Sequence, residues 1–466
     1  MSLRLAHRKA RRAVAAQSST LEVSSSPPKE RASDYHATVY FLFLFFAFYL
    51  TLPIIDIPLL GLSFSAPVFF LVAMPVFLRS PRPWVSLYRN WIMLAAAIWL
   101  GIFFSAMFAG LLSGGARIDQ RGWLSLVRFA YWILIFVVTI YLVSSQPGLG
   151  ARLTVTMSIG ITILGLLRLG EAVFGGAIGA WTRLQLISQN SYGIQFSMFF
   201  PLLLSLLYWK NRRYLSIFAV FVVLGAIFIN GSRSNWIAIL VAVSIFFWIL
   251  LRNHSQRLRS AVILFVLAIL LSLGAVLAPV VLPDVVGAFE QRLGTFDRLE
   301  EDKSYLIRQL MVQKGLGLFQ ENPLFGVGIS RWNRESTPLE LPRILSYASQ
   351  EHFDIKSSHN SYISFLAETG LAGSVPFALL LLILFFAGYR AVGHLVRYGH
   401  IWAAGVYAGF IGMSIHLWTL SGLTGTAPWF IYGMVAGLIV LERQIAKQAS
   451  QDSNAPRILL PHSRRF

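Results

Sequence analysis

The sequence contains no cysteine, and only 13% of its 466 residues are charged. The absence of cysteine excludes disulfide bonds and thiolate metal sites. Soluble domains carry about a quarter charged residues, so this composition argues against a soluble globular protein. The sequence also lacks the alternation of polar and apolar residues that is typical of membrane β-barrels.

Apolar residues, in contrast, are abundant. They make up 56% of the chain, and long apolar runs recur along most of it. A run of about 20 apolar residues crosses a bilayer as a helix. Hydropathy therefore predicts an all-α polytopic membrane protein with about 12 transmembrane helices, near residues 37–55, 60–78, 91–113, 123–144, 153–174, 191–209, 214–230, 235–251, 260–282, 370–389, 401–420 and 427–441.

The loops between these spans differ in charge. Alternate loops are rich in Lys and Arg, as at Arg79, Lys210, Arg257, Arg390 and Arg443. Positive loops face the cytoplasm, so both termini are expected there. The formal net charge of +19 then reflects orientation in the membrane. It does not indicate nucleic-acid binding, because no base-reading or stacking motif accompanies it.

The same reading divides the chain into five parts: a basic cytoplasmic tail (1–36), spans one to nine (37–282), a long hydrophilic loop (283–369), spans ten to twelve (370–441) and a second cytoplasmic tail (442–466). The long loop faces the periplasm by this count. Its segment SYLIRQLMVQKGLGLFQENPLFGVGI has helical apolar spacing and then a Pro/Gly stop. We therefore expect a folded cap over the bundle.

The pattern GVYAG, from Gly405 to Gly409, favours helix packing within one bundle.

Several polar residues lie near the outer ends of spans, where charge is costly and often marks a cavity. They are Arg183 in WTRLQLISQNSYG, Arg233 in NGSRSNW, Arg308 in SYLIRQL, and His359. Arg183 and Arg233 could instead extend toward the outer headgroups. Arg233 stands out because GSRS joins two spans through small residues, and Ser232 and Ser234 add hydrogen-bond donors. Arg binds phosphate oxygens in a bidentate manner, so two or three such residues would suit a diphosphate.

Further polar residues lie within the spans themselves. Arg168 and Glu171 are three positions apart on a helix and could simply pair. A lone histidine such as His416 is more often a satisfied packing residue than a ligand.

The segment EHFDIKSSH supplies His352, Asp354 and His359, all of which are capable of binding a metal. Their spacing fits no standard metal motif, and no Asp-x-Asp pair occurs in the chain. A serine hydrolase is not supported either, because no G-x-S-x-G elbow is present. His359 is then a structural residue or a general base with a near-neutral pKa. Spacing alone favours the structural role.

Three segments in order, NGSRSNWIAIL, SYLIRQLMVQKGLGLFQENPLFGVGI and SSHNSYISFLAETGLAGSVP, resemble the O-antigen ligase and polymerase superfamily. The resemblance implies a bacterial inner-membrane enzyme with glycosyltransferase C-type architecture. Such enzymes move a glycan from undecaprenyl diphosphate to an acceptor at the periplasmic face, without a metal or other cofactor.

The resemblance also implies roles for residues. His359 matches the essential loop histidine and would be the catalytic base. Arg233 and Arg308 match the two best-known arginines and would bind the diphosphate, with Arg183 matching a more loosely kept position. Supporting roles are expected for Ser232, Ser234, Asn360 and Tyr362, although Tyr362 is better explained by packing. The glycines of LAETGLAG would let the helix bend where the site meets the membrane.

Within the family, an O-antigen ligase that uses lipid A–core of lipopolysaccharide as acceptor is the first choice, and an O-antigen polymerase is the alternative. A protein O-oligosaccharyltransferase usually has a sizeable soluble C-terminal domain, whereas only residues 442–466 follow the last predicted span. A transporter of the lipid-linked oligosaccharide is the alternative outside enzymes, but repeated halves are not evident. The expected partners are the undecaprenyl diphosphate-linked donor, the lipid A–core acceptor and membrane lipids, with no nucleic acid.

Overall fold

The structure is a computed structural model, which describes residues 29–52, 65–79, 83–112, 120–174, 188–281, 287, 290, 294, 301–345, 349–354, 356–421, 423 and 425–454. Within these ranges the chain forms helices and no strand. It is an all-α polytopic membrane protein, as the sequence predicts.

Each predicted span coincides with a helix of the structure. These helices are α2 (Lys29–Thr51), α3 (Ser65–Arg79), α4 (Pro83–Leu112), α5 (Gln120–Ser145), α6 (Pro147–Phe174), α7 (Gln189–Leu206), α8 (Arg213–Asn230), α9 (Arg233–Leu251), α10 (His254–Val281), α14 (Ser361–Arg397), α15 (Trp402–His416) and α16 (Thr426–Asn454). Among the described residues, 7 helices are long and apolar enough to cross a membrane by themselves, and two shorter apolar helices lie in α2 and α3. The number of 12 crossings stays a prediction.

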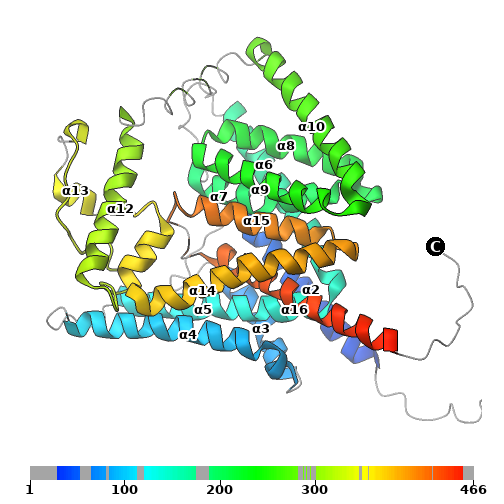
Figure 1. Ribbon diagram of the computed structural model, residues 1–466, viewed down its shortest axis with the longest axis horizontal. Helices are drawn as coiled ribbons and strands as arrows, with labels where there is room; N and C mark the ends of the chain where they lie inside the picture. Colours follow the sequence, from blue (N-terminus) through cyan, green and yellow to red (C-terminus); the bar gives the residue numbers. More distant parts are fainter. Residues whose placement is uncertain are drawn as a thin grey trace, which may run out of the picture.

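Helix α15 lies at the centre of the bundle. It packs between α7 and α9 on one side and α14 and α16 on the other (Figure 1). Almost every residue of α15 is buried. A Cβ on Gly405 would lie 2.8 Å from the carbonyl oxygen of Pro201, and one on Gly409 would meet the carbonyl of Met198. The small residues of GVYAG therefore let α15 contact α7 closely, which confirms that they pack within the bundle.

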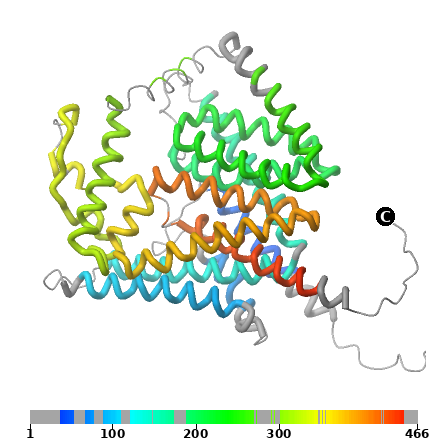
Figure 2. Tube along the Cα trace, viewed as in Figure 1, coloured from blue at the N-terminus to red at the C-terminus, as the bar shows by residue number. Residues whose placement is uncertain are grey.

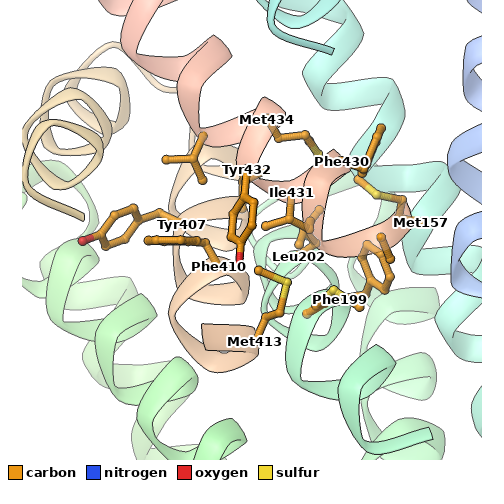
Figure 3. Close-up of a cluster of buried hydrophobic side chains, with 14 of the residues drawn as sticks. Met157, Phe199, Leu202, Tyr407, Phe410, Met413, Phe430, Ile431, Tyr432 and Met434 are labelled. Carbon is orange, nitrogen blue, oxygen red and sulfur yellow. The ribbon is translucent and has the colours of Figure 1, made fainter. Parts of the chain in front are cut away.

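Large apolar side chains fill the space around α15. Phe410 of α15 packs against Tyr407 of the same helix and Tyr432 of α16, and Met413 and Phe199 belong to the same buried cluster (Figure 3). Burial of such side chains from water stabilises soluble cores, but in a bilayer close packing contributes most of the stabilisation. The dense centre gives the bundle a rigid frame on which outer loops can be positioned.

The hydrophilic segment after α10 is folded in the ranges that the structure describes. Helices α12 (Lys303–Glu321) and α13 (Gln350–Asp354) lie at one end of the bundle, and α12 runs across the direction of the spans (Figure 1). A short 3-10 helix, η3 (Arg343–Leu345), joins them, and another, η1 (Lys210–Arg212), precedes α8. Leu310, Met311, Trp332 and Phe353 form a core separate from that of the bundle. This region is called the outer cap below.

Helix α14 begins at Ser361 rather than near residue 370, and it bends at Gly370. Gly370 has non-helical dihedral angles (φ 57°, ψ −158°). The bend frees two carbonyls and two amides of α14, and the segment NPLFGVG binds all four. Val327 N and Gly328 N donate to the carbonyls of Ala367 and Glu368, and the amides of Leu371 and Ala372 donate to residues 323 and 324, each at 2.9 Å.

The bend therefore joins the outer cap to the membrane part of α14, where the yellow trace meets the orange trace in Figure 2. It confirms that the glycines of LAETGLAG allow a bend. The resulting hydrogen bonds satisfy backbone groups that a membrane environment leaves costly if unpaired.

Hydrogen bonds join α14 to neighbouring segments at both ends of the bundle, and basic residues gather at one of these ends. Ser361 N, at the start of α14, donates to the carbonyl of Leu417 (2.9 Å), just after α15. At the other end, Arg252 after α9 donates to Tyr389 OH of α14 (3.1 Å). Basic residues gather at that second end, including Arg252, Arg257, Arg390, Arg397 and Arg443.

Candidate active site

His359 lies in the segment between α13 and α14, in a conformation that is uncommon for a side-chain-bearing residue (φ 48°). Its backbone N donates to Ser421 Oγ (3.0 Å), and Ser421 Oγ lies 2.8 Å from Ser358 Oγ. The segment after α15 thus holds the backbone of His359 in place. Strained conformations of this kind are often found at functional sites.

The imidazole of His359 is half-buried. Its Nε2 lies 3.2 Å from Ser357 Oγ, while Nδ1 has no hydrogen-bond partner among the described residues. Burial lowers the pKa of His359, and the positive charges of Arg308 and Lys356 lower it further. The neutral ring, which can accept a proton, is therefore favoured.

Arg233 is the first residue of α9 and follows Gly231, whose left-handed backbone (φ 65°) ends α8. The Nη2 of Arg233 donates to Asp302 Oδ2 in an ion pair whose side chains are 15% and 13% exposed. Asp302 also caps α12, because its Oδ1 accepts from Ser304 N (2.8 Å) and Tyr305 N (3.3 Å). Although burial raises the pKa of Asp302, the bond from Arg233 brings it below its usual value.

Asp302 thus links the GSRS turn to the first turn of α12. Sequence reasoning missed this residue. The available signal was an Asp directly before a helical run, in EDKSYLIRQ, which is typical of a helix N-cap.

Arg308 lies farther along α12 and is the most isolated charge of the group. It is half-buried, its Nε is fully buried without a partner, and no described residue forms a hydrogen bond or ion pair with it. Burial lowers the pKa of Arg308, repulsion from Arg233 lowers it further, and Asp302 opposes both. The charge of Arg308 also acts on His359. The structure therefore brings Arg233, Arg308 and His359 together at the cap end of the bundle.

The two serines of GSRS flank Arg233, and their Oγ atoms lie 3.2 Å apart. Ser232 precedes α9 but makes no capping hydrogen bond with its side chain. Arg183 lies outside the residues that the structure describes, so its place relative to the site stays a prediction.

Asn360 and Tyr362 are engaged in the fold. Asn360 caps α14, because its Oδ1 accepts from the backbone N of Tyr362 and of Ile363, both at 3.1 Å. Tyr362 OH donates to the carbonyl of Ser414 (2.9 Å), and its ring packs on Trp418. These contacts fix the start of α14 directly after His359.

A buried polar pair lies beneath the GSRS turn. His416 of α15 and Asn235 of α9 are both 0% exposed. A Cβ on Gly193 would lie 3.2 Å from His416 Nε2 and 3.3 Å from Asn235 Cβ. His416 is therefore a packing residue, as expected, and the backbones of Ser234 and Asn190 lie close to its ring.

The pairing of Arg168 and Glu171 is confirmed. Arg168 Nη1 donates to Glu171 Oε2, and Tyr192 OH donates to Oε1, both at 2.9 Å. This buried group ties α6 to α7.

Within the described residues, no group of three or more His, Asp or Glu could hold a metal ion. Asp354 instead contacts Lys314, whose fully buried Nζ donates to the Asp354 carbonyl (2.9 Å) and lies 3.4 Å from its Oδ1. Trp332 Nε1 donates to the carbonyl of Lys356 (2.8 Å). These bonds anchor the segment before His359 to α12 and to Trp332 of the outer cap.

Comparison with known proteins gives one finding. The sequence model of the O-antigen ligase family matches residues 218–378, and a search of curated proteins gave no match. The matched segment contains Arg233, Asp302, Arg308 and His359, whereas Arg183 lies outside it. The members of that family are glycosyltransferase-like enzymes of the ligase and polymerase type, and the match over residues 218–378 of this polytopic membrane protein supports an O-antigen ligase superfamily member.

Proposed function

We propose that the protein transfers O-antigen polysaccharide from undecaprenyl diphosphate to a hydroxyl group of lipid A–core at the periplasmic face of the bacterial inner membrane. The observation that carries the proposal is the half-buried guanidinium of Arg308, which pairs with no described residue and lies close enough to Arg233 and His359 for their charges to interact. A desolvated cation without a partner is costly. A diphosphate would satisfy it.

The chemistry needs one base and one anion site. The acceptor oxygen attacks the anomeric carbon of the donor sugar, and its proton passes to the neutral His359 ring. The bond between that carbon and the diphosphate oxygen breaks, and its electron pair leaves with the diphosphate. Arg308 and Arg233 bind the growing negative charge. Displacement from the opposite face makes the reaction inverting, and the activated donor supplies the driving force without a metal.

Asp302 adds a condition to this mechanism. It holds Arg233 in the absence of the donor, and a diphosphate must share or replace that ion pair. Arg308 has no such competitor among the described residues, so we assign it the larger part in donor binding.

The test uses purified protein, carrier-linked glycan and lipid A–core. His359→Ala is expected to lower kcat by at least about 100-fold, as for loss of a general base, while donor KM stays near the wild-type value. Arg308→Lys is expected to raise donor KM about tenfold, because an ammonium cannot form the paired hydrogen bonds of a guanidinium. Exposed residues of the same cap give matched controls, His352→Ala and Arg334→Lys, which should retain full activity.

Normal transfer by His359→Ala would overturn the assignment of the base. The acceptor is tested separately by replacing lipid A–core with a second carrier-linked glycan. Elongation of that glycan at a higher rate than ligation would make the protein a polymerase. Movement of the carrier lipid across vesicles without a new glycosidic bond would make it a transporter.

A further inference from the structure

Two adjoining cavities lie at the basic end of the bundle, on either side of the last turns of α14. The larger, of about 560 Å³, lies between α14 and α16, and Leu382, Phe386 and Arg443 are among its lining residues. The smaller, of about 240 Å³, lies between α14 and the end of α9. Arg390 and His394 line both cavities, so the two form one continuous site, which we call the basic cleft.

The basic cleft is rich in positive charge that no described residue neutralises. Arg390, Arg397 and Arg443 are exposed and form no ion pair or hydrogen bond with any described residue. Arg252 donates to the neutral Tyr389 hydroxyl rather than to an acid.

The acidic side chain of the lining is Glu442, which lies 2.7 Å from His394 Nδ1. It is therefore already engaged, and the arginines are left to face an external anion. Guanidinium groups prefer phosphate oxygens, which they bind in pairs.

The wall of the larger cavity next to these arginines is apolar and open to the side. Leu382 is 54% exposed and Phe386 is 61% exposed on α14, a helix long and apolar enough to cross the membrane. A soluble anion would gain nothing from this wall. A phospholipid would place its phosphate on the arginines and its acyl chains along Leu382 and Phe386.

The cleft is remote from the candidate active site. Arg233 begins α9 and Arg252 follows its end, so the two lie about 28 Å apart along a helix of 19 residues. The diphosphate of the donor therefore does not reach the cleft from the active site.

We propose that the basic cleft binds an anionic phospholipid of the leaflet opposite the active site. Basic pockets between transmembrane helices are suited to headgroups of this kind. Arginines lie on both sides of α14, with Arg390 between them. A lipid with two phosphates, such as cardiolipin, can engage both cavities at once and binds more tightly than phosphatidylglycerol.

The test is native mass spectrometry of the full-length protein in detergent, titrated separately with cardiolipin, phosphatidylglycerol, phosphatidylethanolamine and inorganic phosphate. Cardiolipin is expected to bind most tightly and phosphatidylethanolamine most weakly. Arg390→Gln should weaken cardiolipin binding about fivefold, as for one basic residue at a membrane surface. Arg443→Gln is a second variant with the same expectation.

Arg89→Gln is the matched control. Arg89 is exposed near the start of α4 and does not line either cavity. An equal loss of cardiolipin binding in this variant would overturn the proposal, because general surface charge would then explain it. Equal affinity for phosphatidylethanolamine would also overturn it, as would displacement of cardiolipin by millimolar inorganic phosphate. None of these readouts depends on glycan transfer, so the cleft and the active site are tested independently.

Discussion

At the scale of single residues, the functional interpretation depends on the surroundings of His359. A histidine used only for packing would have its nitrogens satisfied or enclosed. His359 instead has a half-buried ring with one nitrogen that forms no hydrogen bond with any described residue, and its backbone is held in an uncommon conformation by Ser421. The neighbouring positive charges favour its neutral form, which is the form that a general base needs.

This environment predicts the pH dependence of transfer. Because the pKa of His359 lies below its usual value of 6.5, the neutral base persists in mildly acidic solution. The acid limb of kcat/KM should therefore fall below pH 6.5. Lys356→Gln removes a positive charge, so the pKa of His359 rises and the acid limb moves to higher pH. Rates of transfer measured from pH 5 to 8 check this.

Lys356→Arg is the control for that change, since it keeps the charge and should leave the acid limb in place. An acid limb that does not move in Lys356→Gln, or that moves equally in both variants, would contradict a role for His359 as the titrating base.

The sequence was informative for some residues of the site and silent for others. Arg233, Arg308 and His359 were identified because short motifs surround them. Asp302 and Ser421 were missed because their partners are distant in sequence: Asp302 pairs with Arg233 across 69 positions, and Ser421 binds His359 across 62. Only the fold brings such residues together, and a single sequence carries no signal for the pairing.

At the scale of elements, the bend of α14 connects the outer cap to the bundle. Gly370 and the segment NPLFGVG approach so closely that a Cβ on Gly370 would lie 2.5 Å from Gly326 N and 2.6 Å from the carbonyl of Leu324. The bend places the first turns of α14, which follow His359, against the cap, while the rest of the helix crosses the bundle.

Gly370→Ala is therefore expected to destabilise the protein by about 2 kcal/mol or more, because a positive φ disfavours alanine and backbone atoms on the facing segment cannot move aside. Thermal unfolding in detergent should show a lower Tm. Gly393→Ala, in the same helix, meets nothing within 4 Å and should be neutral or stabilise by up to about 1 kcal/mol. Equal Tm values for the two variants would mean that the bend does not depend on Gly370.

Helices were the elements that the sequence predicted best. Apolar length alone located α8 and α9 closely, since a spanning helix needs a continuous apolar run. The start of α14 was placed too late because residues 361–369 mix polar and apolar side chains. Hydropathy does not detect helical turns that precede the apolar run. In the structure, Asn360 is the N-cap residue of α14, and the bend at Gly370 separates residues 361–369 from the rest of the helix.

At the scale of the whole molecule, the two ends of the bundle have different chemistry. One end carries the outer cap with Arg233, Arg308 and His359, and the other carries the basic cleft. Basic loops are retained in the cytoplasm, so we expect the candidate active site to face the periplasm. On that side it would meet the glycan carrier and the acceptor that we propose as its substrates.

The orientation can be tested with single cysteines, because the natural chain contains none and gives no background. Gln313 is exposed on α12 of the outer cap, and Ser255 is exposed in the first turn of α10 at the basic end. On cells with a permeabilised outer membrane, a membrane-impermeant maleimide should label Gln313→Cys at once. It should label Ser255→Cys only after the inner membrane is opened. The reverse pattern would place the outer cap in the cytoplasm and contradict the orientation that the basic loops predict. Labelling of both positions while the inner membrane is intact would show that the two ends are not on opposite sides of it.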